Sequence, residues 1–357
     1  MDYLLRVNGK CLMNRTLSDR PLFITGFPRS GTTLLNLILS SHSQIELKNN
    51  DDLLMEFYYK RINPNNYINE KEFDNLFLNN LNIESKRFLK MIPNELLNQV
   101  KQKLPISGWE VFQLLLSNES KKDNYWGSKT HSYIWFYDSL VNNYKNCNFI
   151  IILRDPRSVI LSRYVKSISK NSNSLKDTNS IPIEKIHYDE AVSFFIQHAH
   201  HWTAWHNVFE EVKKESIKKN IYILKYEDLV SFPEQTIKQL FNHISIEYEH
   251  GIINSEQRYI HPVSNNSEIG YAHSNLKKPI NKRLKNKWKK LDNRLIEIIE
   301  NICRHNMLRY NYSTETNTSI YNKMYYNSYL DMKYQYKQKW INHYNIIRKN
   351  FKEICLK

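Results

Sequence analysis

The sequence predicts an α/β fold in which helices flank a parallel sheet. Three apolar segments rich in β-branched residues, 22–25, 149–153 and 221–225, are each followed by a segment with helical character. Apolar runs of this kind are typical of strands buried on both faces, and their alternation with helices indicates a parallel sheet. With 357 residues and a 41% hydrophobic composition, the chain is long enough to bury such a core.

The predicted elements alternate from the first apolar segment onward. Strands are expected at 22–25, 125–128, 149–153 and 221–225, and helices at 32–39, 109–116, 133–144, 156–169, 188–219 and 233–243. Pro156 supports the start of one of these helices, because proline is favoured in the first helical turn.

Two segments interrupt this alternation, and one follows it. Residues 52–104 show helical periodicity with Asn-rich breaks, which predicts a helical insertion, and the Asn/Ser-rich residues 170–182 predict a loop. We expect a single domain over residues 20–310. The Tyr-, Asn- and Lys-rich residues 311–357 are predicted to form a C-terminal helical extension.

Composition limits the classes of partner. The formal net charge of +15 suits a nucleic acid, an acidic membrane or a phosphorylated small molecule, although heavy use of Asn, Lys, Ile and Tyr explains it equally well. The four cysteines lack C-x-x-C spacing, which predicts reduced thiols and no metal site. The longest aliphatic run is far shorter than the ~20 residues of a membrane span, and the start lacks a signal-peptide pattern. We therefore expect a cytoplasmic protein without a membrane span.

A candidate phosphate-binding loop lies between the first predicted strand and helix. Residues 26–33 read G-F-P-R-S-G-T-T, which places backbone N–H groups at a helix N-terminus, where anions bind. The glycine spacing matches the ATP/GTP loop G-x-x-x-x-G-K-[ST], but Thr32 occupies the lysine position and the positive charge enters at Arg29. The loop therefore disfavours a triphosphate with its Mg²⁺ chemistry. An ordinary strand–turn–helix with a glycine turn is the alternative.

A second candidate motif follows the strand predicted at 149–153. Arg154 stands just past the end of that strand, where open α/β sheets bind ligands, and Ser162 lies about two helical turns further on. An arginine with a hydroxyl suits a phosphate monoester. The alternatives are a surface ion pair between Arg154 and Asp155 and a solvated helix serine.

Taken together and in this order, the two motifs resemble the PAPS-dependent sulfotransferase family over roughly residues 20–300. The resemblance implies an enzyme that transfers the sulfuryl group of 3′-phosphoadenosine 5′-phosphosulfate (PAPS) to a hydroxyl or amine. It implies that Arg154 and Ser162 bind the 3′-phosphate. It also implies that the first loop binds the 5′-phosphosulfate through Arg29, Ser30, Gly31, Thr32 and Thr33. An arginine in place of the small-molecule branch's lysine is similar to the carbohydrate, tyrosylprotein and many bacterial branches.

Two later features are also similar to the family. Residues 226–229 read Y-E-D-L and resemble its Y-E-D-[LM] step, which implies that Tyr226 lies near the cofactor; a core aromatic is the alternative. The basic stretch 274–290 resembles a late loop that covers the 3′-phosphate. It lacks the R-K-G tripeptide, so no single lysine can be assigned, and a solvated charged face is the alternative.

Catalysis requires positive charge at the transferring group and a general base for the acceptor. Residues 129–131 read K-T-H and resemble the same tripeptide of the small-molecule branch. The resemblance implies that Lys129 stabilises the transferring group and that His131 is the base. An imidazole suits that role because its ordinary pKa is ~6.5. A surface or helix-capping histidine is the alternative.

A carboxylate is the rival base. In the R-S-G-T-T branches a glutamate commonly follows the first helix, and here Asn50, Asp51 and Asp52 occupy that place. Asparagine cannot accept the proton, so Asp51 or Asp52 is the candidate. The chain mixes features of two branches, which leaves open both the base and the acceptor: a sugar, a tyrosine, a phenol or a lipid-linked glycan.

Two other classes of function remain open. The first is a nucleotide or small-molecule kinase with ATP and Mg²⁺, which Thr32 disfavours. The second is a non-enzymatic basic protein that binds nucleic acid through basic and aromatic residues on one face, a composition that residues 311–357 share in part. Nucleic-acid binding gives no reason for a phosphate loop at a strand end, so we expect no such partner.

Overall fold

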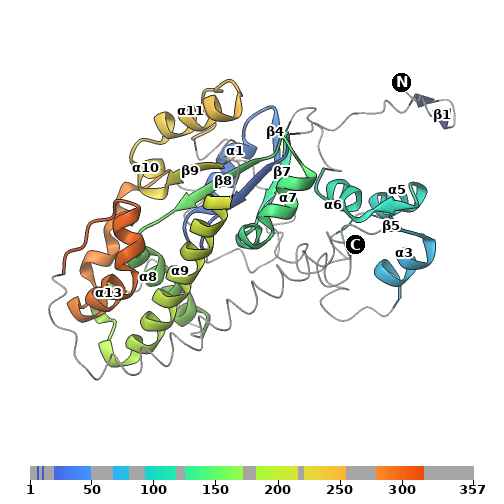
Figure 1. The fold of residues 1–357 in the computed structure, drawn as a ribbon. Coiled ribbons are helices and arrows are strands. Elements are labelled where there is room, and N and C mark those ends of the chain that lie inside the picture. Colours follow the sequence, from blue (N-terminus) through green and yellow to red (C-terminus); the bar gives the residue numbers. More distant parts are fainter. Residues whose placement is uncertain are drawn as a thin grey trace.

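A five-stranded parallel sheet forms the centre of the fold (Figure 1). The computed structural model describes residues 6–7, 10–11, 20–49, 67–79, 92, 94–117, 125–171, 182–215, 221–254 and 279–316. The strands lie in the order β4-β7-β3-β8-β9, and each neighbouring pair is parallel. Their bounds are Leu22–Thr25 for β3, Ile45–Asn49 for β4, Tyr125–Lys129 for β7, Asn148–Leu153 for β8 and Ile221–Lys225 for β9. The predicted α/β class and the four predicted strands are confirmed.

Strand β4 lies at one edge of the sheet and is not among the predicted strands. Its residues alternate in burial: Ile45 and Leu47 are buried, whereas Glu46 and Lys48 are partly exposed. This alternation of period two is typical of a strand with one covered face, so the signal is present in the sequence. Charged residues at every second position conceal it from a search for continuous apolar runs.

The six helices predicted between residues 32 and 243 are present within the described residues. The helices are α1 (Thr32–Ser40), α6 (Gly108–Ser117), α7 (Tyr137–Asn143), α8 (Pro156–Asn171), α9 (Tyr188–Glu215), α10 (Tyr226–Ser231), α11 (Pro233–Ile244) and α13 (Asn293–Arg309), with 3-10 helices η1 (His131–Phe136), η2 (Ile183–Lys185) and η4 (Lys282–Lys290). The helix predicted at 133–144 begins earlier, as η1. Helices α10 and α13 are not predicted, and residues 216–219 of the predicted long helix lie outside the described residues.

The two faces of the sheet pack against different helices. Side chains alternate along β3 and β8, because successive residues of a strand point to opposite faces. Phe23 and Phe149 pack on the face that α8, α9 and α13 cover, and Ile24 and Ile150 pack on the face that α1 and α11 cover. Figure 1 shows α9 and α11 on opposite sides of the sheet. Burial on both faces explains the near-continuous apolar character of the central strands.

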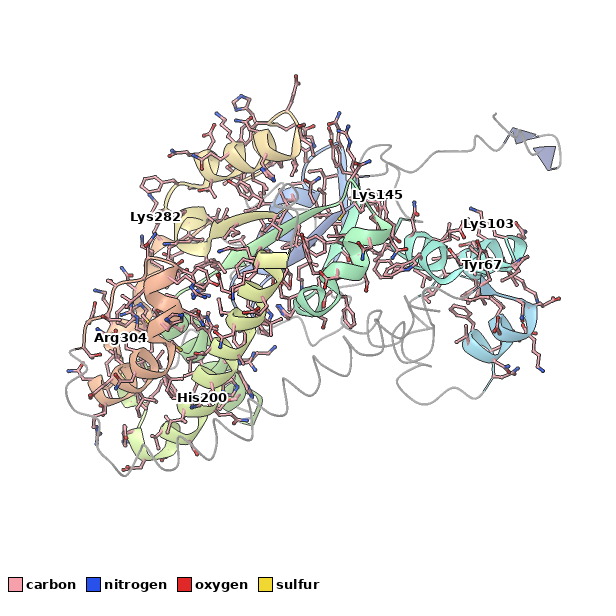
Figure 2. All side chains as sticks on the ribbon, viewed as in Figure 1. Tyr67, Lys103, Lys145, His200, Lys282 and Arg304 are labelled. Atoms are coloured by element: carbon pink, nitrogen blue, oxygen red, sulfur yellow. The ribbon has the colours of Figure 1, made fainter. Side chains whose placement is uncertain are left out.

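The predicted insertion is described in part. It contains α3 (Glu70–Phe77) and α5 (Asn94–Gln102), together with a small antiparallel pair, β5 (Tyr67–Ile68) and β6 (Ile106–Ser107). In Figure 2 its labelled Tyr67 and Lys103 lie across the molecule from His200 and Arg304 of α9 and α13. A second short pair, β1 (Arg6–Val7) and β2 (Lys10–Cys11), precedes the sheet.

Parts of two predicted segments lie outside the described residues. Residues 172–181 of the predicted loop and 317–357 of the predicted extension lie outside the described residues, and residues 312–316 form no helix. Across the described ranges, no helix is long and apolar enough to cross a membrane.

Candidate active site

The predicted site residues that the structure describes gather at the carboxyl edge of the sheet. Strand β3 ends at Thr25 and β7 at Lys129, and Ile24 lies beside Lys129 in the register of these two strands. Strand β8 ends directly before Arg154 and β9 directly before Tyr226. Because the strands are parallel, their carboxyl ends meet at one edge, where open α/β sheets bind ligands.

The backbone of the loop after β3 includes a left-handed conformation and close contacts that favour glycine. Gly31 has a φ of 100° and is the N-cap of α1, and Arg29 also has a positive φ of 77°. A Cβ at Gly31 would lie 2.5 Å from Cδ2 of Tyr226, and a Cβ at Gly26 would lie 2.5 Å from the carbonyl oxygen of Ile152. Close neighbours therefore require glycine at both positions, and the backbone conformation requires it at Gly31 as well.

The loop carries unused hydrogen-bond capacity that fits an anion. The first amide bond within α1 runs from Leu35 N–H to the Gly31 carbonyl, so the helix supplies no acceptor for the N–H groups of Thr32 and Thr33. The Ser30 hydroxyl is buried and has no hydrogen-bond partner among the described residues. A buried polar atom normally has a partner, and an anion cradled by the loop would supply one.

The two predicted motifs meet at this loop. Arg29 Nε donates to the hydroxyl of Ser162 at 3.1 Å, although the two residues are 133 positions apart. Arg154 Nη1 donates to the Arg29 carbonyl at 2.8 Å, and its guanidinium lies 4.0 Å from the centroid of the Tyr226 ring. Ser162 is therefore not a solvated helix serine, and Tyr226 packs between loop and arginine as well as in the core.

A third arginine adds positive charge to the site. Burial together with the charges of Arg154 and Arg163 lowers the pKa of Arg29 to about 10. The Nε atoms of Arg154 and Arg163 are buried and have no hydrogen-bond partner within the described part of the chain. Arg163 lies one residue after Ser162 on α8, with its guanidinium 5.4 Å from the Phe27 ring. Such a concentration of cations favours a bound anion. Sequence reasoning missed Arg163, although its place beside Ser162 could have indicated it.

Asp155 belongs to a separate buried network. Its carboxylate accepts hydrogen bonds from the Arg157 side chain at 2.6, 3.0 and 3.2 Å, so Arg157 rather than Arg154 is its ionic partner. Arg157 also donates to Glu300 at 2.5 Å and lies 3.6 Å from the Trp288 ring centroid. The surface ion pair between Arg154 and Asp155 that the sequence allowed is replaced by this network, which leaves Arg154 directed at the loop.

The Lys-Thr-His step also contacts the loop. His131 Nδ1 lies 2.7 Å from the Gly26 carbonyl oxygen, which can only accept, so Nδ1 is the ring nitrogen that carries the proton in the neutral imidazole. The lone pair is then on Nε2, as a general base requires. Thr130, not His131, caps η1, because its hydroxyl accepts from Ser132 N–H at 3.2 Å. Lys129 is 5% exposed at the end of β7.

Asp51 and Asp52 lie outside the described residues; β4 ends just before them, with Asn49 paired to Lys129.

In the basic stretch, residues 274–278 are likewise outside the described part of the chain. Within η4, three lysines are engaged by protein groups: Lys285 with Ser231, Lys289 with Glu315 and Lys290 with Glu184. Across the described residues, no group of three His, Cys, Asp or Glu side chains could hold a metal ion.

Comparisons with known proteins identify the fold and the family. The chain has 19% identity to the sulfotransferase domain from the curacin biosynthetic pathway, with a TM-score of 0.50 and coverage of 82% of this chain and 97% of that one. It has 16% identity to the sulfotransferase domain of the Synechococcus PCC 7002 olefin synthase, with a TM-score of 0.51 and coverage of 80% and 95%. These structures show the fold. No curated protein matches the sequence. The model of the sulfotransferase family matches residues 21–250, and the chain therefore belongs to the sulfotransferase family of enzymes.

Proposed function

We propose that this enzyme transfers the sulfuryl group of PAPS to a hydroxyl or amine acceptor. One observation carries the proposal: Arg29, Arg154 and Ser162 converge on a loop whose buried Ser30 hydroxyl has no partner among the described residues. Two phosphate-binding motifs at one site suit a nucleotide with phosphate groups at two positions of its ribose.

Different residues of the site can bind the two phosphate positions of such a nucleotide. Arg29, Ser30 and the N–H groups of Gly31, Thr32 and Thr33 are proposed to hold the 5′-phosphosulfate, because they line the N-terminus of α1. Arg154 and Ser162 are proposed to hold the 3′-phosphate, with Tyr226 beneath the guanidinium of Arg154 at 4.0 Å. The orphaned Nε of Arg154 is a donor that this phosphate would engage.

The chemistry asked of the protein is charge stabilisation and proton transfer. PAPS supplies an activated sulfuryl group with a phosphate leaving group. Arg29, Lys129 and the N-terminus of α1 are proposed to stabilise the negative charge of the transferring group, a role that fixed cations and dipoles can fill. Nε2 of His131 is proposed to accept the proton of the acceptor hydroxyl or amine, because Nδ1 carries the ring proton. Asp51 and Asp52 remain the rival bases.

Nucleotide selectivity in the absence of metal is the first expected result. In EDTA, 3′,5′-ADP should stabilise the protein more than 5′-AMP in a thermal-shift panel, because only the former reaches both motifs. A ligand at 100 times its dissociation constant adds ~2.7 kcal/mol to the free energy of unfolding. Stabilisation by ATP–Mg²⁺ alone would favour a kinase instead, and equal stabilisation by both adenylates would remove the 3′-phosphate assignment.

A further inference from the structure

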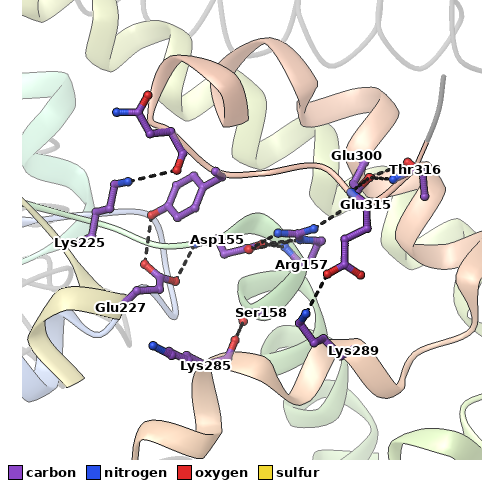
Figure 3. Close-up of polar contacts among 12 residues, drawn as sticks. Asp155, Arg157, Ser158, Lys225, Glu227, Lys285, Lys289, Glu300, Glu315 and Thr316 are labelled. Atoms are coloured by element: carbon purple, nitrogen blue, oxygen red, sulfur yellow. Dashed lines mark hydrogen bonds and ion pairs between the residues drawn. The ribbon is translucent and has the colours of Figure 1, made fainter. Parts of the chain in front are cut away.

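The segment after α13 contacts residues that neighbour the proposed 3′-phosphate site. Figure 3 shows the polar contacts that tie it to Lys225, Glu227 and Glu300. Tyr312 in this segment is 7% exposed, and its hydroxyl donates to Glu227 Oε2 at 3.2 Å. Its ring centroid lies 4.8 Å from Lys225 Nζ. None of the motifs found in the sequence includes Tyr312, so the segment is a separate contributor to this region.

Glu227 connects Tyr312 to the backbone that carries Arg154. Its Oε1 accepts the Asp155 N–H at 3.1 Å, and that N–H belongs to the rigid peptide unit between Arg154 and Asp155. Burial raises the pKa of Glu227, while the positive charge of Arg154 acts in the opposite direction, so this charge lies close to the carboxyl. Glu227 therefore holds the base of the Arg154 side chain while the neighbouring Tyr226 supports its guanidinium.

The far end of the segment is connected to Asp155 by a second set of contacts. Glu300 accepts the N–H groups of Glu315 at 3.0 Å and Thr316 at 2.9 Å. Glu300 also pairs with Arg157 at 2.5 Å, and Arg157 pairs with Asp155 at 2.6 Å. Because both ends of the segment lead to Asp155, the Tyr312 hydroxyl is held against Glu227 by fixed structure.

We infer that Tyr312 is a positioning residue for recognition of the nucleotide 3′-phosphate. Its hydroxyl orients Glu227, Glu227 fixes the Asp155 N–H, and this sets the position from which Arg154 reaches the phosphate. The inference rests on the proposed function. Its distinctive consequence is selectivity: Tyr312 should affect binding of a 3′-phosphate and not of the 5′-phosphate, which the loop holds.

The test compares two dissociation constants in the full-length protein without metal. Tyr312→Phe keeps the ring and its contact with Lys225 and removes only the hydroxyl. Loss of a hydrogen bond to a carboxylate should raise the dissociation constant for 3′,5′-ADP about three- to tenfold and leave that for 5′-AMP nearly unchanged. In an Arg154→Ala background the same substitution should have no further effect on 3′,5′-ADP, because its effect passes through Arg154.

Tyr310→Phe is the matched control. The Tyr310 hydroxyl donates to Glu210 at 2.7 Å, so its removal also breaks a buried Tyr–Glu bond, but the acceptor is a residue of α9 and not Glu227. The nucleotide preference of this variant should equal that of the parent. Should Tyr312→Phe not fold, Glu227→Ala removes the acceptor of the Asp155 N–H and must lower the preference at least as much.

The outcomes separate this inference from the proposed function. A parent protein with no preference for 3′,5′-ADP removes the proposed function itself. If the parent prefers 3′,5′-ADP, three results with Tyr312→Phe would overturn only the inference. They are an unchanged preference, an equal loss of affinity for both nucleotides, and a change in preference no larger than that of Tyr310→Phe. An unchanged preference in Glu227→Ala overturns the inference in the same way.

Discussion

Replacement of His131 by alanine is expected to slow sulfuryl transfer by about 10²- to 10⁴-fold, the usual contribution of a general base. The dissociation constant for 3′,5′-ADP should change little, because a base acts on the acceptor and not on the cofactor's phosphates. The parent's rate should fall at acidic pH, since a protonated imidazole cannot accept a proton, and the variant should lose this acidic limb. Single-turnover transfer of radiolabelled sulfuryl groups to a panel of phenols, sugars and tyrosyl peptides measures the rate and its dependence on pH.

Two controls separate the chemical role of His131 from its contact with the loop. His131→Asn keeps an N–H donor where Nδ1 donates to the Gly26 carbonyl but cannot act as a base, so it should be as slow as the alanine variant. Asp51→Asn and Asp52→Asn keep shape and remove basicity. If either abolishes transfer while His131→Ala retains it, the carboxylate is the base and the enzyme is closer to the carbohydrate and tyrosylprotein branches.

Replacement of Arg29 by alanine is expected to lower turnover by on the order of 10²-fold or more, because it removes a cation at the transferring group. We do not expect a matching loss in the stability of the folded protein. Burial and the charges of Arg154 and Arg163 lower the pKa of Arg29 to about 10. Arg29 is still protonated at neutral pH, but its charged form is less favourable in the folded state than in the unfolded state. Thermal unfolding of the unliganded variant should therefore occur at or above the temperature of the parent.

Arg29→Lys is the informative companion variant. Lysine keeps the charge but cannot reproduce the planar donor that Arg29 Nε directs at Ser162. We expect turnover between that of the parent and that of Arg29→Ala. If Arg29→Ala transfers sulfuryl groups at the parental single-turnover rate, Arg29 is not part of the site.

The parallel sheet and the position of the motifs at the ends of its strands could be predicted because their signals are local. The apolar strands at 22–25 and 149–153 are each followed directly by a motif, and the parallel sheet brings both motifs to one edge. Strand β4 escaped prediction because Glu46 and Lys48 interrupt its apolar residues. Helix α10 was not predicted because four of its six residues, 226–229, form the Y-E-D-L motif and were interpreted only as that motif.

The supporting contacts of the site could not be predicted because they join residues that are distant in sequence. The hydrogen bond from Arg29 to Ser162 and the approach of Arg163 depend on how α8 packs beside the loop. Tyr312 reaches Glu227 across 85 positions, and no pattern in the chain links the two. The sequence also gives Asp155 two arginine neighbours, and only the fold selects Arg157.

The most direct measurement of the central claim is a calorimetric titration of the parent and of Arg154→Ala with 3′,5′-ADP and 5′-AMP in EDTA. Arg154 Nη1 donates to the Arg29 carbonyl of the loop at 2.8 Å, and its buried Nε has no acceptor among the described residues. We predict that the parent binds 3′,5′-ADP about 10- to 100-fold more tightly than 5′-AMP, the range expected for charge-assisted hydrogen bonds, and that Arg154→Ala loses most of this preference. Equal affinity of the parent for both nucleotides, or an undiminished preference in Arg154→Ala, would contradict the account.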